Sequence, residues 1–359
     1  MDELKLEDFL GKSELSIVEA MQKISNNLHG ILFITDSEQH LIGSLTDGDI
    51  RRWLVKTGKL DVQVSKVMFK NTVFIQENKK DKANEIMQKK SITALPIVDS
   101  NKTIISIIFA SGSKINSHSK DNLLKEVSVV IMAGGRGTRL YPYTKILPKP
   151  LVPIGDIPII ERIINSFCNY NVNDFYIPVN YKKGMIKSYF NDLNPNYSIT
   201  YIEEDKPLGT AGSLNLISKK FDRPVIVTNC DILIKADYED IYKHHVNSGN
   251  KLTIVSALKK IVIPYGVLNA GKNGIINSLE EKPSHSYFIN TGMYILDADL
   301  FSMIPKDTCF HMTDLADLLI KNNQQVGMYP ISEDDFLDMG ELEEMKRMEQ
   351  KLTQTGNQD

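Results

Sequence analysis

The stretch that decides the fold is VSVVIMAGGRGTRLYPYTKILPKPL, residues 127–151. Its first six residues form an apolar, β-branched run, which predicts a strand buried inside a sheet. Glycines follow at Gly134, Gly135 and Gly137, and they allow backbone N–H groups to approach phosphate oxygens closely. The stretch ends with cations on a proline-rich segment, where fixed φ angles lower the entropic cost of ordering the loop. Together these features predict a preorganised site for a phosphorylated ligand.

Two familiar phosphate-binding motifs do not fit this loop. A P-loop requires Gly-Lys followed by Ser or Thr, whereas Arg139 and Leu140 stand in that place. The dinucleotide fingerprint requires a helix that starts at its third glycine, but Leu140 occupies that position and Pro142 follows two residues later. The loop is therefore of another kind, and the cations that distinguish it are Arg139 and Lys149.

The rest of the chain after residue 127 alternates short apolar runs with longer amphipathic segments. The runs lie at 175–178, 199–202, 224–228, 252–257 and 287–296. Continuous apolar runs of this length are typical of strands buried on both faces of a mostly parallel sheet, so this part is expected to be α/β. Ligands of such sheets bind outside the carboxyl ends of the strands, which makes the residues just after each run the candidates for function.

The first third of the chain contains an internal repeat. MQKIS at 21–25 recurs as MQKKS at 87–91, and ILFITDS at 31–37 aligns with ALPIVDS at 94–100. Each unit is expected to form a helix, a strand, a turn and a second strand. A polar stretch at 111–121 has the composition of a linker. The expected organisation is a repeat module at 1–120 with repeats at about 13–60 and 66–112, a linker at 121–126, an α/β domain at 127–350 and a tail at 351–359.

Composition excludes several classes of protein. The 359 residues include 42 Lys and Arg against 45 Asp and Glu, a near balance that argues against a nucleic-acid or anionic membrane partner. No run of about 18 apolar residues occurs, so no transmembrane helix is expected, and the acidic start lacks the apolar core of a secretory signal. The three cysteines stand far apart and form neither a disulfide framework nor a metal pair. A cytoplasmic location is therefore expected.

The glycine-rich stretch resembles the signature of the sugar-1-phosphate nucleotidyltransferase family, GGxGTRL followed by Pro, Thr and PKPL. Further segments follow in that family's order: LGTAG at 208–212, Asp231 at a strand end, EKP at 281–283, NTG at 290–292 and FLDMG at 336–340. The resemblance covers residues 127 to about 350. It implies a Rossmann-like domain with a mixed, mostly parallel sheet, preceded by the smaller α/β module.

The resemblance also implies a reaction, the attack of a sugar 1-phosphate on a nucleoside triphosphate with release of pyrophosphate. The attacking phosphate oxygen is already anionic, so no general base is needed, and the seven histidines form no motif that would supply one. Catalysis would then come from positioning and charge neutralisation, with Mg²⁺ as the cofactor.

Roles are carried over from the family residue by residue. Arg139, Lys149 and Asp231 would be catalytic, and Asp231 and Asp338 would hold the metal. The nucleotide-binding residues would be Ala133, Gly134, Gly135, Gly137, Thr138, Arg139, Lys149, Leu208, Gly209, Thr210 and Gly212. The sugar-phosphate residues would be Tyr265, Gly266, Glu281, Lys282, Asn290 and Thr291. Acids at strand ends also serve as helix caps or turn formers, which is the structural alternative for the two aspartates.

The repeat module resembles a tandem CBS pair, because LIGSLTDGDI at 41–50 matches the second half of a CBS motif. In that family the equivalents of Thr46 and Asp49 bind an adenine nucleotide, and the module regulates or dimerises the attached enzyme. The second repeat has SIIFAS at 106–111, with no acidic residue at the equivalent place. The alternative is that Thr46 and Asp49 cap the helix that follows. A homo-oligomer is expected.

The LGTAG form of the nucleoside loop resembles guanylyl-transferring members, and a CBS pair ahead of the transferase resembles members that act on glucosamine 1-phosphate in nucleotide-sugar biosynthesis. GTP and glucosamine 1-phosphate are therefore the expected substrates. Two alternatives stay open: transfer of uridylyl or cytidylyl to another sugar or alcohol phosphate, and an inactive protein that senses nucleotides.

Overall fold

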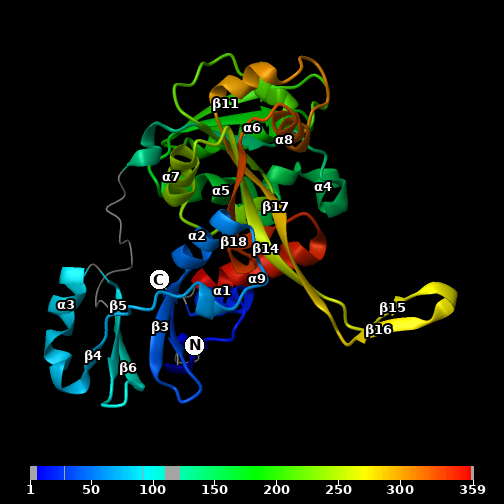
Figure 1. Ribbon diagram of the computed structural model, residues 1–359. Coiled ribbons are helices and arrows are strands. Elements are labelled where there is room, and N and C mark those ends of the chain that lie inside the picture. The colour runs from blue at the N-terminus through cyan, green and yellow to red at the C-terminus, as the bar shows by residue number, and fades with distance from the viewer. Residues whose placement is uncertain (1–5, 28, 91, 110–121, 357–359) are drawn as a thin grey trace. The chain divides into compact units, whose positions relative to one another are not determined.

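The computed structural model describes residues 6–27, 29–90, 92–109 and 122–356. Its contacts divide the chain into two compact units, and each unit is built from segments that are separate in sequence (Figure 1). The first unit comprises Met1–Ser119, Ala257–Ile289 and Pro330–Asp334. The second comprises Lys120–Ser256, Asn290–Tyr329 and Asp335–Asp359. Strands β14, β17 and β18 therefore contribute residues to both units.

The N-terminal segment of the first unit forms two three-stranded sheets and three helices. Its strands are β1 (Leu10–Lys12), β2 (Ile31–Thr35), β3 (Leu41–Thr46), β4 (Ile75–Gln76), β5 (Ala94–Val98) and β6 (Ile104–Phe109). Its helices are α1 (Ile17–Asn26), α2 (Asp47–Thr57) and α3 (Ala83–Lys90), with 3-10 turns at Leu6–Phe9, Val64–Lys66 and Glu77–Lys82. The sheet orders are β1-β2-β3 and β4-β5-β6. The two repeats thus share one order of elements.

The repeat extends to the details of strand pairing. Ile31 pairs with Thr46 in the first hairpin, and Ala94 pairs with Phe109 in the second. Each hairpin has an irregularity three residues after its first pair, at Ile34 and at Ile97 respectively. The offset between equivalent positions is the 63 residues seen in sequence, and it places Phe109 where the first repeat has Thr46. The polar stretch interpreted as a linker, 111–121, lies outside the described residues.

The core of the first unit includes side chains from the distant segments. Ile17, Leu32 and Leu54 are fully buried in one cluster with Leu258 of β14, and Phe288 of β17 packs against the same cluster. The Arg51 side chain on α2 donates a hydrogen bond of 3.4 Å to a backbone carbonyl of β18. The core around Ile17, Leu32 and Leu54 is therefore completed by parts of the chain that follow these residues by more than 200 positions.

The second unit is an α/β domain. Its strands are β7 (Val129–Met132), β8 (Pro153–Ile154), β9 (Ile157–Pro158), β10 (Asp174–Val179), β11 (Ser198–Glu203), β12 (Val225–Asn229), β13 (Ile232–Ile234), β14 (Leu252–Val262), β17 (Ser284–Leu296), β18 (Val326–Ser332) and β19 (Phe336–Asp338). Its helices are α4 (Tyr143–Ile146), α5 (Ile159–Cys168), α6 (Lys183–Leu193), α7 (Tyr238–Ser248), α8 (Met312–Lys321) and α9 (Leu342–Gly356). Short 3-10 turns lie at Leu123–Glu126, Thr138–Leu140, Lys149–Leu151, Gly212–Leu216, Ala298–Met303 and Glu333–Asp335.

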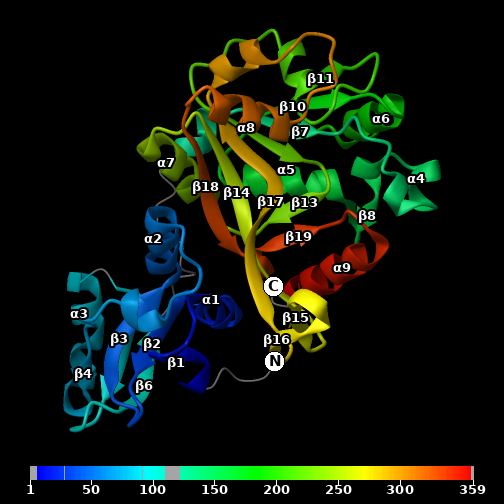
Figure 2. The same ribbon diagram turned by 45° about the vertical axis from the view of Figure 1, so that its right-hand side comes forward.

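A seven-stranded sheet of order β11-β10-β7-β12-β17-β14-β18 forms its centre. The pairs β11-β10, β10-β7 and β7-β12 are parallel, whereas β12-β17 is antiparallel. Val130 and Met132 of β7 pack in a cluster with α8, and Val129 and Ile131 on the opposite face are also fully buried. Helix α5 lies on that second face (Figure 2). The expectation of a mixed, mostly parallel sheet with both faces covered is confirmed.

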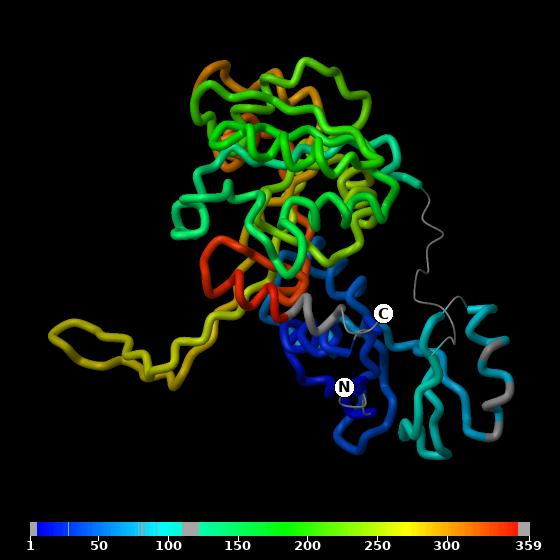
Figure 3. The backbone as a smooth tube through the Cα atoms, turned by 180° about the vertical axis from the view of Figure 1, so that it is seen from behind, coloured from blue at the N-terminus to red at the C-terminus, as the bar shows by residue number. Residues whose placement is uncertain are grey.

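Between the two long strands β14 and β17 the chain forms a ribbon of two further strands. These are β15 (Val267–Ala270) and β16 (Ile276–Glu280), joined by a 3-10 turn at Lys272–Gly274. They pair antiparallel as a separate two-stranded sheet, coloured yellow in Figure 3. No helix in the described part of the chain is long and apolar enough to cross a membrane.

Candidate active site

The glycine-rich loop leaves the end of the central strand β7 and folds back against the Lys149 turn. Gly137 has a φ of 63°, a conformation that L side chains rarely adopt. A Cβ at Gly137 would lie 2.9 Å from Cβ of Lys149, so a side chain has no room there. The Thr144 hydroxyl closes the loop by donating a hydrogen bond of 2.7 Å to the Gly137 carbonyl. Only glycine allows this approach, which brings Lys149 beside the loop.

Two aspartates meet at the end of the neighbouring strand β12. Asp231 comes directly before β13, and Ile232 of β13 pairs with Asp338 of β19. The Met339 N–H donates to the Asp231 carbonyl at 2.8 Å, and the Gly340 N–H donates to Oδ1 of Asp338 at 2.7 Å. A short antiparallel pairing thus brings together two acids that are more than 100 residues apart in sequence.

Cations face these acids. Nζ of Lys149 forms an ion pair with Oδ2 of Asp231, and both side chains are largely buried. Burial, followed by the nearby Asp231 carboxylate, raises the pKa of Asp338, while Lys149 and Arg139 lower it. Nη1 of Arg139 lies 3.5 Å from the place that a Cβ on Gly340 would take. Four of the residues expected in the site therefore meet in one cluster of two positive and two negative charges.

A pocket adjoins this cluster. Its walls come from the carboxyl ends of β7, β11 and β12 and from the loop after β11, as expected for a parallel sheet. The lining residues are Met132, Gly134, Gly135, Arg139, Lys149, Glu204, Pro207, Leu208, Gly209, Thr210, Asn229, Cys230 and Asp231. Most of the residues expected to bind a nucleotide are in this set. Ala133 and Thr138 lie next to lining residues in the chain, Gly137 and Gly212 lie two positions from one, and none of the four is part of the wall.

The loop at 208–212 is fastened to the segment that leads into α8. The N–H groups of Ala211 and Gly212 both donate to the Phe310 carbonyl at 3.0 Å, and the Phe310 N–H donates to the Leu208 carbonyl at 2.9 Å. Gly209 has a φ of 79°, and a Cβ there would lie 2.6 Å from the Phe310 oxygen. The Thr210 hydroxyl accepts a hydrogen bond of 3.0 Å from the Met312 N–H. The loop is therefore held in one shape before any ligand binds.

Sequence reasoning missed five residues of the pocket wall, Met132, Glu204, Pro207, Asn229 and Cys230. Two of them, Glu204 and Cys230, can titrate. Burial raises the pKa of Glu204, whose carboxylate is hydrogen-bonded with Ser213 and with the backbone of Leu208. Glu204 follows the strand expected at 199–202, so its position after an apolar run was an available signal. Burial raises the pKa of the Cys230 thiol to about 12, so this cysteine is protonated at neutral pH and is not a nucleophile.

The residues expected to contact a sugar phosphate fall into two groups. Asn290 and Thr291 belong to the second unit, where the Thr291 hydroxyl is buried and donates to the Val255 carbonyl at 2.8 Å. The Asn290 amide donates to the Tyr294 hydroxyl at 2.8 Å. Tyr265, Gly266, Glu281 and Lys282 are exposed residues at the base of the β15–β16 ribbon, which belongs to the first unit.

Thr46 and Asp49, the residues expected to bind an adenine nucleotide, form a helix cap. The Asp49 N–H donates to the Thr46 hydroxyl, and Oδ2 of Asp49 accepts from the Thr46 N–H at 2.9 Å and from its hydroxyl at 2.6 Å. Arg52 also donates to Oδ1 of Asp49, at 2.6 Å. Thr46 and Asp49 therefore cap the start of α2, as the alternative predicted. To bind a nucleotide as well, the same side chains would have to contact the ligand while they cap the helix.

The two carboxylates of the charge cluster are ligands of the type that Mg²⁺ prefers. No group of three or more His, Cys, Asp and Glu side chains gathers among the described residues, which is unlike a site built wholly from protein ligands. Asp231 and Asp338 provide two carboxylates beside a pocket with cationic walls. Mg²⁺ is commonly held by one or two carboxylates together with substrate phosphates and water, so these two residues suit it.

The sequence that forms this pocket identifies the protein family. The profile of the nucleotidyl transferase family matches residues 128–355, well over half of the chain. The chain belongs to the nucleotidyl transferase family. A CBS domain profile matches residues 12–56, which is the first of the two repeats. The family resemblance seen in the sequence is confirmed for the transferase domain and for a CBS domain ahead of it.

Individual relatives of this nucleotidyl transferase agree with that assignment. A mannose-1-phosphate guanyltransferase from Debaryomyces hansenii is 33% identical over 204 residues, covering 54% of this chain and 56% of the relative. The bifunctional protein GlmU from Methanococcus maripaludis is 34% identical over 216 residues, which is 56% of this chain and 49% of the relative. The chain thus spans about half the length of the curated relatives it matches.

Among solved structures, HddC from Yersinia pseudotuberculosis is similar to this nucleotidyl transferase with a TM-score of 0.50 and 28% identity. The match covers 63% of this chain and 99% of that one.

Proposed function

We propose that the chain transfers a guanylyl group from GTP to a sugar 1-phosphate and releases pyrophosphate. The observation that carries this proposal is the meeting of Arg139, Lys149, Asp231 and Asp338 beside a glycine-rich pocket at the carboxyl edge of the sheet. A binding protein that had lost activity would have no need to bury Lys149 and Asp231 against each other. The conjunction of cations and carboxylates favours catalysis over sensing alone.

The proposed chemistry requires no covalent intermediate on the protein. An oxygen of the sugar phosphate forms a bond to the α-phosphorus, while the bond from that phosphorus to the bridging oxygen breaks and its electron pair leaves with pyrophosphate. The Arg139 and Lys149 side chains neutralise charge that grows on the leaving group. Asp231 fixes the Lys149 ammonium by the ion pair. Asp231 and Asp338 would hold Mg²⁺, which supplies further positive charge for the phosphate oxygens.

The choice of GTP rests on the pocket and on the relatives. Guanine presents two neighbouring N–H donors on its Watson–Crick edge, and an ionised carboxylate is an acceptor-only group that suits such a pair. Glu204 is a buried carboxylate in the pocket wall, and the relatives named above include a guanyltransferase. Uracil presents one N–H between two carbonyl oxygens, which would face a carboxylate unfavourably. This chemistry favours guanylyl transfer over the uridylyl and cytidylyl alternatives.

For the sugar we propose glucosamine 1-phosphate, with mannose 1-phosphate as the second candidate because curated relatives carry that substrate in their names. Glu281 and Lys282 offer a carboxylate for an amine and an ammonium for a phosphate. Tyr265, Gly266, Asn290 and Thr291 are proposed as further contacts.

The decisive experiment measures pyrophosphate release from GTP, ATP, UTP, CTP and dTTP against glucosamine, mannose and glucose 1-phosphates. Fastest turnover with GTP and glucosamine 1-phosphate is the expected result. Preference for UTP or CTP would replace the guanylyl proposal, and absence of turnover with every pair would favour the nucleotide-sensing alternative. Chelation with EDTA should abolish turnover, and added Mg²⁺ should restore it.

Substitutions in the charge cluster test the assigned roles. Lys149→Ala and Asp231→Ala should each lower kcat/KM by at least about 100-fold, because each removes a preorganised charge contact. Lys145→Ala is the matched control, since Lys145 is an exposed cation on the same segment that lies over the Tyr141 ring and outside the pocket wall. A decrease of less than about threefold for Lys149→Ala would contradict its role.

A further inference from the structure

A second cavity of the α/β domain lies at the amino edge of the central sheet. The wall of this amino-edge cavity is made of residues within 215–221, which lead into β12, and within 298–306, which follow β17. Because β12 and β17 are antiparallel, the start of one strand and the end of the other lie at the same edge. The charge cluster lies at the opposite end of β12, a strand of five residues that is about 16 Å long. The cavity is therefore separate from the candidate active site.

The wall of the amino-edge cavity is largely apolar and already formed. The cavity has a volume of about 540 Å³, compared with about 290 Å³ for the pocket beside the charge cluster. The rings of Phe221 and Phe301 pack edge to face with centroids 5.7 Å apart, and Ile217 belongs to the same hydrophobic cluster. The Asn215 amide donates to the carbonyls of Phe301 and Ile304 at 3.2 and 2.9 Å, which fastens the two wall segments together. Preformed apolar cavities of this size are typical sites for small molecules.

The charges that are available in this cavity are positive. Lys219 forms an ion pair of 2.7 Å with Asp174. Asp299, the acid among the lining residues, forms an ion pair of 3.0 Å with the lysine that precedes β14. Lys220 and Lys306 also line the cavity and are exposed, and neither forms an ion pair with a residue that the structure describes. Two ammonium groups can therefore receive an anion that enters the cavity.

We propose that the amino-edge cavity binds an organic phosphate. Its phosphate group contacts the ammonium groups of Lys220 and Lys306, because hydrogen bonds between ionised partners are the strong ones. Its organic part, a flat ring, packs against Phe221 and Phe301, since aromatic side chains prefer offset or edge-to-face contact with another ring. The cavity shares no lining residue with the pocket beside the charge cluster, so both sites can be occupied at once.

The cavity is connected along the chain to the nucleotide loop at 208–212. Asn215 lies three residues after the end of this loop, and Lys306 lies four residues before Phe310. Two N–H groups of the loop donate to the Phe310 carbonyl, and the Phe310 N–H donates back to the loop. A ligand that holds both wall segments in place therefore stabilises the fastened shape of the loop. Binding in the cavity and binding of the nucleotide are then coupled, an inference that rests on the proposed function.

Equilibrium dialysis of the full chain against phenyl phosphate, which combines one phosphate group with one aromatic ring, tests the site. The wild type should show saturable binding. Lys220→Ala/Lys306→Ala should raise the dissociation constant at least about tenfold, because it removes two hydrogen bonds between charged groups. Inorganic phosphate, which lacks the ring, and phenol, which lacks the charge, should each bind at least about tenfold more weakly than phenyl phosphate.

The matched control is Lys321→Ala/Lys346→Ala, which removes two exposed ammonium groups outside both pockets. This control and Lys149→Ala should bind phenyl phosphate like the wild type. Absence of saturable binding to the wild type at millimolar concentrations would overturn the site, as would an unchanged dissociation constant in Lys220→Ala/Lys306→Ala. Binding that is lost in Lys149→Ala would place the ligand in the pocket beside the charge cluster and would also overturn it.

The KM for GTP at saturating sugar 1-phosphate, with and without saturating phenyl phosphate, tests the coupling. Phenyl phosphate should lower this KM at least about fivefold in the wild type and leave it unchanged in Lys220→Ala/Lys306→Ala. An unchanged or raised KM in the wild type would overturn the coupling. Absence of turnover without phenyl phosphate would contradict the proposed guanylyl transfer alone, because dialysis detects binding in the cavity without any turnover.

Discussion

Glu204 illustrates how one side chain of the pocket can be tested apart from the charge cluster. Its carboxylate lies close behind the glycine-rich loop, where a Cβ on Gly134 would approach Oε2 to 2.8 Å. Glu204→Gln keeps the shape but replaces one acceptor oxygen with a donor. We expect kcat/KM for GTP to fall by about 10- to 100-fold, the cost of losing a hydrogen bond to a charged group.

The same substitution should lower kcat/KM for UTP far less than for GTP, so the ratio of the two is the informative quantity. Kinetics with both nucleotides at saturating sugar phosphate provide it. An equal decrease for both would assign Glu204 to holding the loop in shape and would remove it from base recognition.

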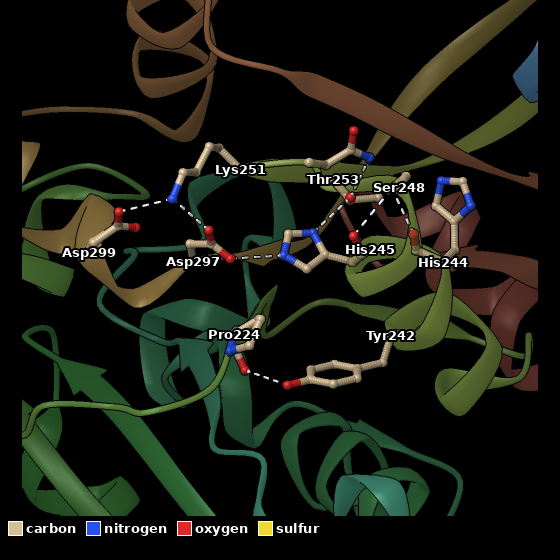
Figure 4. Close-up of polar contacts among 10 residues, drawn as sticks. Pro224, Tyr242, His244, His245, Ser248, Lys251, Thr253, Asp297 and Asp299 are labelled. Atoms are coloured by element: carbon tan, nitrogen blue, oxygen red, sulfur yellow. Dashed lines mark hydrogen bonds and ion pairs between the residues drawn. The ribbon is translucent and has the colours of Figure 1, made fainter.

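A second test of a single residue concerns His245 and the pH dependence of stability. His245 of α7 is buried, with Nδ1 2.9 Å from the Thr253 hydroxyl and Nε2 3.3 Å from Oδ1 of Asp297 (Figure 4). Asp297 also accepts a hydrogen bond of 2.8 Å from Lys251. Burial lowers the pKa of His245 from 6.5, and this effect exceeds the opposing one of Asp297. The His245 imidazole is therefore neutral in the native state at neutral pH.

The sign of the effect follows from proton binding. Between the lowered native pKa and the unfolded value of 6.5, the unfolded chain binds more protons, so stability falls as the pH drops through this window. The thermal midpoint of the wild type should decrease as the pH is lowered from about 7 to about 5. In His245→Gln this decrease should be smaller. The exposed His285→Gln serves as control. A variant with the wild-type slope would contradict this assignment.

A comparison of helices α1 and α2 can distinguish the two roles of Thr46 and Asp49, which are helix capping and adenine-nucleotide binding. Both helices begin with a capping box, Ser16 with Glu19 on α1 and Thr46 with Asp49 on α2. Ser16→Ala and Thr46→Ala should each cost about 0.5–2 kcal/mol of stability, because each leaves a helix N–H without its partner. Only Thr46→Ala should also abolish a shift of the thermal midpoint caused by ATP or AMP.

Ligand-induced shifts in the wild type and both variants decide this point. A shift kept in Ser16→Ala and lost in Thr46→Ala supports an adenine nucleotide site at the start of α2. No shift in the wild type, or equal shifts in all three proteins, would leave Thr46 and Asp49 with the capping role alone.

The elements that could be predicted from the sequence are those that a short stretch of residues determines. The apolar run before the glycine-rich loop, six of the seven strands of the sheet and the repeat could be predicted because burial and turn chemistry act over a few residues, whereas β18 was not expected. The family's order of motifs was needed for Asp338, since its approach to Asp231 depends on the β13–β19 pairing. Glu204 has no local signal beyond its place after a strand. The fastening of the 208–212 loop to Phe310 depends on contacts across 100 residues and could not be predicted.

At the scale of the whole molecule, the composite first unit predicts the effect of a change far from the repeats. Leu258 of β14 is buried in the cluster formed by α1, β2 and α2. Leu258→Ala should destabilise the first unit by about 2–5 kcal/mol, because it leaves a cavity in that core. Hydrogen exchange at the amides of α1 and α2 should speed up accordingly, although these helices end some 200 residues earlier.

Val55→Ala on α2 is the matched control, since this side chain is 43% exposed and its removal should leave the exchange rates within the wild-type range. Unchanged protection of α1 in Leu258→Ala would mean that the cluster is stable without its distant member.

The composite unit also has a consequence for synthesis. A ribosome produces the repeats first, yet the segments that complete the first unit, Ala257–Ile289 and Pro330–Asp334, are made more than 130 residues later. Domains generally fold as units during synthesis, beginning at the N-terminus. Here the nascent repeats must wait with Ile17, Leu32 and Leu54 incompletely covered until most of the transferase domain has been translated. We therefore expect the first repeat, whose core includes Leu258, to depend on chaperone protection for longer than the second.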